Sequence, residues 1–369
     1  MLIESFRREI DYCTYCPKMC RFACPVAETD ARETYTPTAK MTMAYLLKQG
    51  SVETSPDLAV SFFKCTACAH CKVYCDHEIK VGPVLEAARA DLFVAGQTLP
   101  AAVKLAAKVR ETGTPHDVPL EPVAAGIIPE KYRGPQARTA IWLGGDLIAS
   151  GGERIRKLVG ILDAVGAENV SVIAAGRLDT GAALYHCGDR EGLRAHASEV
   201  LASLQGYDTV VTVAPEDAVM FQHGYPRVNI KVTPKVVWWV DWICEKLAGR
   251  ELRAFPEPLV IHDPCEAARK LGASGRIREL LKMCGAVVRE PAWSGEDTSC
   301  CGAGSAYARI FPADAKKMAR RRMEELYETG TRKTVTASPL CGQHLKSSSP
   351  GVEVLDVIDV VAHSLGVQA

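Results

Sequence analysis

The stretch Lys64–Asp76 constrains this chain more than any other, because it carries four cysteines with the spacing C-x2-C-x2-C-x3-C. They are Cys65, Cys68, Cys71 and Cys75. Three cysteines at this spacing hold one face of a [4Fe–4S] cube, and in a chain with two clusters the fourth cysteine reaches over to the other cluster. The run therefore predicts a second set of cysteines elsewhere in the chain.

A second set is present upstream, with the spacing C-x2-C-x3-C-x3-C and Pro25 directly after it. Its members are Cys13, Cys16, Cys20 and Cys24. The rule of the fourth cysteine predicts crossed ligation. The first cluster would be held by Cys13, Cys16, Cys20 and Cys75, and the second by Cys24, Cys65, Cys68 and Cys71. Asp76 stands where the second run would have its proline, but that proline is not a ligand.

Cysteine is the unusual residue of this chain, with 15 copies. The number is odd and most copies lie two or three residues apart, which suits metal binding better than a disulfide framework. Structural zinc is the alternative for the two quartets, although zinc normally takes two pairs and not two complete quartets. The isolated Cys244 and Cys284 are interpreted as small buried hydrophobic residues.

Composition narrows the class of protein further. The 369 residues carry a formal net charge of zero and no basic tract, which disfavours nucleic acid as a partner. We find no apolar run long enough to span a membrane, and the N-terminal residues do not form a signal peptide. These observations predict a cytoplasmic protein.

The pattern of elements predicts an α/β fold in four parts. An all-helical N-terminal part contains both quartets, a proline- and glycine-rich linker follows, and from Arg138 onward strands alternate with helices, as in parallel sheets covered on both faces. The alternation occurs twice, which indicates an internal duplication. The predicted boundaries are 1–98 for the helical two-cluster domain, 99–137 for the linker, 138–250 for the first α/β repeat and 251–369 for the second.

The linker begins with an amphipathic segment, Leu99–Glu111. We expect it to pack on its own protein; binding to a membrane surface is the alternative. Lys316, Lys317, Arg320, Arg321 and Arg322 form a basic run on a predicted helix. It is interpreted as a solvated face, with docking of an acidic redox partner as the alternative.

Cysteines also follow the predicted strands of the second repeat. They are Cys265 in HDPC, Cys300 and Cys301 in SCCGAG, and Cys341 in SPLCGQH. The carboxyl ends of parallel strands meet at one edge of a sheet, so these thiols are expected to converge. Four thiols there would hold a third iron–sulfur centre, cubane or non-cubane, and Gly302 and Gly304 would let the backbone approach it. A reactive dithiol without metal is the alternative.

These motifs resemble the CCG domain of heterodisulfide reductase. The whole order resembles the D-type subunit of heterodisulfide reductase, and equally the iron–sulfur subunits of glycolate oxidase and anaerobic glycerol-3-phosphate dehydrogenase. The resemblance spans nearly the whole chain. It implies either electron transfer between a flavoprotein and another carrier, or reduction of a disulfide at a non-cubane cluster.

The chain departs from the CCG pattern in both repeats. In the second, Ser338 stands where the final motif would have its first cysteine. In the first, Gly145 replaces a cysteine, His186-Cys187-Gly188 replaces Cys-Cys-Gly, and Ala214 and Asp217 replace the last pair. The resemblance then implies an empty first site. His186, Cys187 and Asp217 are competent ligands for a small metal site, and a vestigial loop is the alternative.

With one site lost, we predict an iron–sulfur electron-transfer subunit of a cytoplasmic multi-subunit oxidoreductase. A flavoprotein and other redox subunits would be its partners, and any membrane contact would be peripheral and made through a partner. The alternative is a catalytic disulfide or quinone reductase acting at the CCG-site cluster. No complete glycine-rich nucleotide fingerprint is present, so flavin and nicotinamide are assigned to a partner. His344 either assists the third centre or faces solvent.

Overall fold

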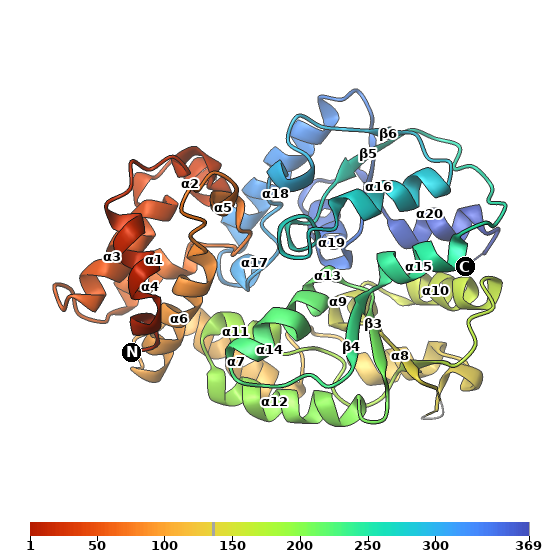
Figure 1. Cartoon of the computed structure of the whole chain (residues 1–369), viewed down its shortest axis with the longest axis horizontal. Coiled ribbons are helices and arrows are strands. Elements are labelled where there is room, and N and C mark those ends of the chain that lie inside the picture. The colour runs from red at the N-terminus through yellow and green to blue at the C-terminus, as the bar shows by residue number, and fades with distance from the viewer. Residues whose placement is uncertain (135–136, 369) are drawn as a thin grey trace.

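The computed structural model describes residues 1–134 and 137–368. Figure 1 shows the N-terminal helices gathered on one side of the molecule, with two α/β units beside them. The two units contain one parallel sheet each. The predicted class, an α/β protein with a helical N-terminus and a duplicated parallel sheet, is confirmed.

The N-terminal part is helical and carries both quartets. A 3-10 helix, Leu2–Phe6, precedes α1. The α-helices are α1 (Arg7–Thr14), α2 (Pro25–Asp30), α3 (Pro37–Lys48), α4 (Pro56–Phe63), α5 (His70–Val73) and α6 (Val81–Val94). Ser55 caps α4: its hydroxyl oxygen accepts a hydrogen bond from the backbone N–H of Leu58 at 3.2 Å, and Pro56 occupies the first helical position. Ile10, Met41 and Phe62 pack without exposure in the core of this part.

The segment predicted as a linker contains two helices. They are α7 (Pro100–Thr112) and α8 (Leu120–Ile127). Helix α7 packs against α11 (Ala182–Cys187) of the first repeat and buries Leu105 and Val109, so its apolar stripe is covered by the protein itself, as expected. Prolines on either side of Leu120 and Glu121 hid α8 from the sequence pattern. Residues 135 and 136, at the end of this segment, lie outside the described residues.

The first α/β repeat is a four-stranded parallel sheet in the order β2-β1-β3-β4. Its strands are β1 (Thr139–Trp142), β2 (Val170–Ile173), β3 (Thr209–Thr212) and β4 (Lys235–Trp238). Its helices are α9 (Gly145–Ala149), α10 (Gly152–Ala164), α11, α12 (Arg190–Ser203), α13 (Pro215–Val219), α14 (Tyr225–Arg227) and α15 (Trp239–Leu247). The central strands are almost wholly buried, as two-sided helical cover requires.

The second repeat repeats the topology in the order β6-β5-β7-β8. Its strands are β5 (Leu259–His262), β6 (Val288–Arg289), β7 (Lys333–Thr336) and β8 (Glu353–Asp356). Its helices are α16 (Ser274–Met283), α17 (Tyr307–Ile310), α18 (Pro312–Tyr327), α19 (Pro339–Ser348) and α20 (Val357–Ser364). The matching strand order confirms the duplication. The last strand of each sheet, β4 or β8, was not predicted.

The interpretation of the basic run on helix α18 as a solvated face or docking surface fits only part of the run, because Lys316, Lys317 and Arg320 are exposed. Arg322 is 1% exposed, so it belongs to neither. Arg321 forms an ion pair with Glu28, and the Arg320 guanidinium donates to the carbonyl oxygen of Ser348 at 3.1 Å. Helix α18 also packs on α2 of the N-terminal part. Arg320, Arg321 and Arg322 thus contact other parts of the protein.

Within residues 1–134 and 137–368, each helix falls short of the length and apolar character that crossing a bilayer requires.

Candidate metal centres

The first quartet lies at the end of α1 and in the loops before α2. Cys13 and Cys20 are buried, whereas Cys16 is half-buried. Burial, followed by neighbouring thiols that include Cys75 of the other run, raises the pKa of Cys13 to about 12 and that of Cys20 to about 11. The fold therefore brings Cys75 to the first three cysteines of the other run, which is the predicted crossed grouping.

The complementary group surrounds one small pocket in the helical part. Its cysteine lining is Cys24, Cys65, Cys68 and Cys71. Ala67 and Ala69, between the cysteines, adopt left-handed backbone angles with φ of 53° and 61°. These angles are uncommon for residues with a side chain, and a tight loop imposes them here. The backbone N–H of Ala67 donates to the sulfur of Cys65 at 3.3 Å.

A buried lysine supports an anionic group in this pocket. Lys40, on α3, is 1% exposed, and its ammonium donates to the sulfur of Cys24 at 3.6 Å. A buried ammonium is costly unless a negative charge lies beside it. Thiolates bound to iron supply that charge, because a coordinating thiol is deprotonated. The residues present therefore fit a [4Fe–4S] cluster, and Lys40 is a residue that the sequence analysis missed.

The third group forms at the strand ends of the second repeat. Cys265 follows β5, Cys300 and Cys301 lie in the loop before α17, and Cys341 is in the first turn of α19. The sulfurs of Cys265 and Cys300 are 4.0 Å apart, and those of Cys301 and Cys341 are 3.4 Å apart. All four side chains are buried. The structure thus brings together the four predicted cysteines, and such a set of thiols fits an iron–sulfur centre.

Neighbouring backbone groups hold this third group in place. The N–H of Gly302 donates to the sulfur of Cys300 at 3.4 Å, in a loop where Gly302 has φ of 89°. A Cβ at Gly302 would meet the backbone oxygen of Ala315 at 3.2 Å, so glycine suits both the angle and the space. Ser338 caps α19, and its hydroxyl oxygen accepts from the N–H of Cys341 at 3.1 Å.

The second and third groups touch each other. Cys68 and Cys300 pack in one buried cluster together with Cys24 and Cys265, and the hydroxyl of Thr66 lies 3.6 Å from the sulfur of Cys300. Arg269, after Cys265, donates to the carbonyl oxygen of Cys68 at 2.5 Å. The second cysteine group of the helical part and the group of the second repeat are therefore adjacent in space.

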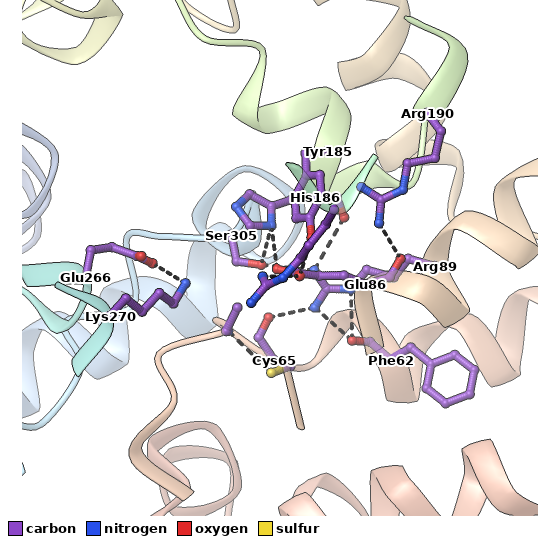
Figure 2. A network of polar contacts seen from close by, with 12 residues as sticks. Phe62, Cys65, Glu86, Arg89, Tyr185, His186, Arg190, Glu266, Lys270 and Ser305 are labelled. Atoms are coloured by element: carbon purple, nitrogen blue, oxygen red, sulfur yellow. Dashed lines mark hydrogen bonds and ion pairs between the residues drawn. The ribbon is translucent and has the colours of Figure 1, made fainter. Parts of the chain in front are cut away.

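Arg89 ties the same region to the first repeat. Figure 2 shows its guanidinium at the centre of a polar network between α6, α11 and the loop after Cys301. It is fully buried and donates to the carbonyl oxygen of Cys65 at 2.8 Å, to the hydroxyl of Ser305 at 2.9 Å and to the carbonyl oxygen of His186 at 3.3 Å. Three segments far apart in sequence thus share one buried cation.

The first repeat does not assemble the alternative metal site. His186 faces Glu86, with its Nδ1 3.3 Å from a carboxylate oxygen, whereas Asp217 accepts a hydrogen bond from the hydroxyl of Thr180 at 3.2 Å. Among the described residues, the group of three compact enough for one metal ion is His262, Cys301 and Cys341, not His186, Cys187 and Asp217. A vestigial loop is the interpretation that this geometry favours.

The remaining candidates have ordinary structural roles. A ring nitrogen of His344 lies 3.1 Å from the carbonyl oxygen of Ala315, so this side chain neither assists the third group nor faces solvent freely. Cys244 and Cys284 are buried hydrophobic residues, as expected.

Comparison with known proteins agrees with these groups. Residues 9–79 match the model of the 4Fe-4S dicluster domain, and residues 259–346 match that of the Cysteine-rich domain. The dicluster match supports two [4Fe–4S] clusters in the N-terminal part.

Two curated relatives are similar over most of the chain. The B-type subunit of fumarate reductase (CoM/CoB) from Methanothermobacter marburgensis is 22% identical over 305 residues, which are 80% of this chain and 60% of that protein. An uncharacterized iron-sulfur protein of Methanocaldococcus jannaschii is 23% identical over 296 residues, 78% of this chain and 58% of that protein. The chain thus spans about three fifths of the length of these relatives.

One solved structure shares the fold. A hypothetical protein from Helicobacter pylori superposes with a TM-score of 0.50 at 8% identity, covering 90% of this chain and 68% of that one. The two domain matches and the similarity to the fumarate reductase protein agree with the heterodisulfide-reductase-like resemblance.

Proposed function

We propose that this protein is the electron-transfer subunit of a multi-subunit oxidoreductase with three iron–sulfur centres. Two [4Fe–4S] clusters would be held by the crossed quartets, and a third cluster by the cysteines of the second repeat. The third set is Cys265, Cys300, Cys301 and Cys341. Such clusters accept and release single electrons at potentials that the surrounding protein sets.

The observation that carries this proposal is the packing of Cys68 and Cys300 in one buried cluster, beside the 3.6 Å contact of Cys300 with Thr66. It makes the three cysteine groups a series: the first shares the helical part with the second, and the second adjoins the third. Cys24 and Cys68 of the second group and all four cysteines of the third are buried, so water is largely excluded where these two groups meet. The protein's own contribution is to hold the groups in fixed succession, through Arg89 and Arg269 among others.

The exposed end of the series is proposed as the docking site of a flavoprotein. Large apolar side chains around the first quartet face solvent, among them Tyr15 at 76%, Met19 at 60% and Phe22 at 56% exposure. Contiguous exposed apolar groups mark interaction surfaces.

Because each cysteine of the described chain is free of disulfides, a reducing compartment, the cytoplasm, is the proposed location.

A second candidate function is catalysis at the third group. A pocket of about 100 Å³ adjoins it, lined by Leu340, Glu216, Glu266 and the loop Ala303–Ala306. Burial raises the pKa of Glu216 to about 8, so this side chain carries a proton at neutral pH and faces the pocket. Reduction of a disulfide or a quinone needs both electrons and protons, and this pocket offers a proton donor.

The test separates the two functions. The flavoprotein that copurifies with the tagged chain is reduced and mixed with the chain, and the rate of cluster reduction is followed by absorbance. Met19→Glu with Tyr15→Ser is expected to slow this step about tenfold or more, whereas Val287→Glu, an equally exposed apolar position in the second repeat, leaves it unchanged. Turnover of disulfides or quinones by the dithionite-reduced chain alone would instead establish the catalytic function.

A further inference from the structure

A buried histidine that the proposed function does not use lies at the third cysteine group. His262 is the last residue of β5, is 1% exposed and pairs in register with Thr336 of β7. One of its ring nitrogens and the sulfurs of Cys301 and Cys341 all lie within 4.8 Å of one another. The sheet fixes this ring beside two of the four sulfurs.

Arg322 determines which ring nitrogen carries the proton. Its Nε donates to Nδ1 of His262 at 3.1 Å. Its other nitrogens donate to a Glu325 carboxylate oxygen and to the carbonyl oxygen of Trp293, each at 2.9 Å, so the guanidinium is locked in place. Arginine has donors and no acceptor, so a hydrogen on Nδ1 would point at another hydrogen. Nδ1 is therefore the acceptor, and the proton of the ring is on Nε2.

The Nε2–H group has no hydrogen-bond partner among the described residues. A buried donor left without an acceptor is costly, and such groups normally have a partner in the complete site. The protonated nitrogen cannot also coordinate iron, because its lone pair is taken. The neighbouring sulfurs of Cys301 and Cys341, once bound to iron, are negatively charged acceptors.

We propose that His262 is a positioning residue that donates a hydrogen bond from Nε2 to the sulfurs of the third centre and thereby raises its reduction potential. The inference rests on the proposed third cluster. Hydrogen bonds to cluster sulfurs stabilise the electron-rich reduced state, which is how the second shell of a metal site tunes it. The residue would set how readily the end of the series holds an electron.

The experiment is a redox titration of the holoprotein, monitored by the electron paramagnetic resonance signal of the third centre. His262→Leu is expected to keep the iron content and to lower the reduced-to-oxidised ratio at a given potential about tenfold, equivalent to about 59 mV for one electron. The matched control is His344→Leu, which removes a histidine near the same cysteine whose ring bonds a backbone carbonyl, and it is expected to leave the potential unchanged.

A second measurement uses the unmodified sequence and is independent of how the variant folds. With 15N-labelled histidine, the third centre should show a weak 15N coupling, typical of a hydrogen-bonded ring. A strong coupling, typical of a directly bound imidazole, or an unchanged potential in His262→Leu would overturn the inference while the proposed function stands. A wild-type protein without a third iron signal would overturn both.

Discussion

The two α/β repeats share one backbone plan and differ in what their strand ends carry. Counting from the ends of β1 and β5, Trp142 occupies the position of His262 and Gly145 that of Cys265. Counting from β3 and β7, Asp217 occupies the position of Cys341. The sheets are retained because their buried strands form the core. The strand ends are free to change because the core does not depend on them.

The first repeat has also filled the space that a cluster would need. A Cβ at Gly145 would lie 2.6 Å from a carboxylate oxygen of Asp179, and one at Gly144, where φ is 79°, would collide with Asp217. Asp179 is itself held by the backbone N–H of Gly181 at 2.8 Å. Carboxyl groups thus occupy the space that thiols occupy in the second repeat. The two strand-end sites therefore differ in the space available as well as in the type of ligand.

The largest expected effect is a difference in iron content between matched cysteine variants of the two repeats. Cys301→Ser removes a ligand of the third centre, and we expect iron to fall from roughly twelve to roughly eight atoms per chain by the [4Fe–4S] count. Cys187→Ser, the matched change in the first repeat, should leave the iron count unchanged. Iron analysis with paramagnetic resonance checks both. Loss of iron in Cys187→Ser would show that the first site binds metal, and it would contradict the conclusion that only the second repeat holds a cluster.

The second prediction concerns how the cysteine loop after β5 is held. Asp263 is fully buried and forms a two-point ion pair with Arg278 at 2.8 and 2.9 Å. The equivalent position in the first repeat is Leu143, which needs no such partner. Arg278→Met leaves a buried carboxylate unpaired and should lower the free energy of unfolding by about 3 kcal/mol.

Urea denaturation of Arg278→Met measures this loss. The control is Arg177→Met, which removes an ion pair with the exposed Glu199 and should cost less than about 1 kcal/mol. Equal losses in the two variants would mean that the buried pair contributes no more than a surface pair, against the argument from burial.

The smallest expected effect comes from an attempt to rebuild the lost site. Gly145→Cys restores a cysteine to the first repeat, but its Cβ meets Asp179, so we expect about 1–3 kcal/mol of destabilisation and no added iron. Gly275→Cys, at a glycine with open space around its Cβ, should be tolerated. Thermal unfolding and iron analysis check both variants. A gain of iron in Gly145→Cys would show that the first repeat still forms a cluster cradle.

Much of this molecule could be predicted from local patterns. Cysteine spacing anticipated the crossed grouping of Cys24 with Cys65, Cys68 and Cys71, since short spacings determine which thiols one loop can present. The alternation of strand-like and helix-like segments anticipated the two parallel sheets. Helix α8 and the last strand of each sheet were missed, because proline placement hid the helix and because the strands are short and partly exposed.

Two cations that lie beside the candidate sites could not be recognised as buried from the sequence. Lys40 looks like any lysine on an amphipathic helix, and Arg322 was wrongly placed in a surface run, yet both are buried beside candidate sites. Their burial follows from which helix face packs against which neighbour. The presence of a charged residue in a helix does not show whether that residue faces the core or the solvent.

The sequence by itself determined the cysteine groups, the helical part and the repeated parallel sheets, because spacing and periodicity act over a few residues. Only the tertiary structure decided the packing of Cys68 with Cys300, the closure of the first repeat by Asp179 and the proton position on His262. Each depends on segments brought together from distant parts of the chain. Long-range packing sets such contacts, and no local pattern of residues encodes them.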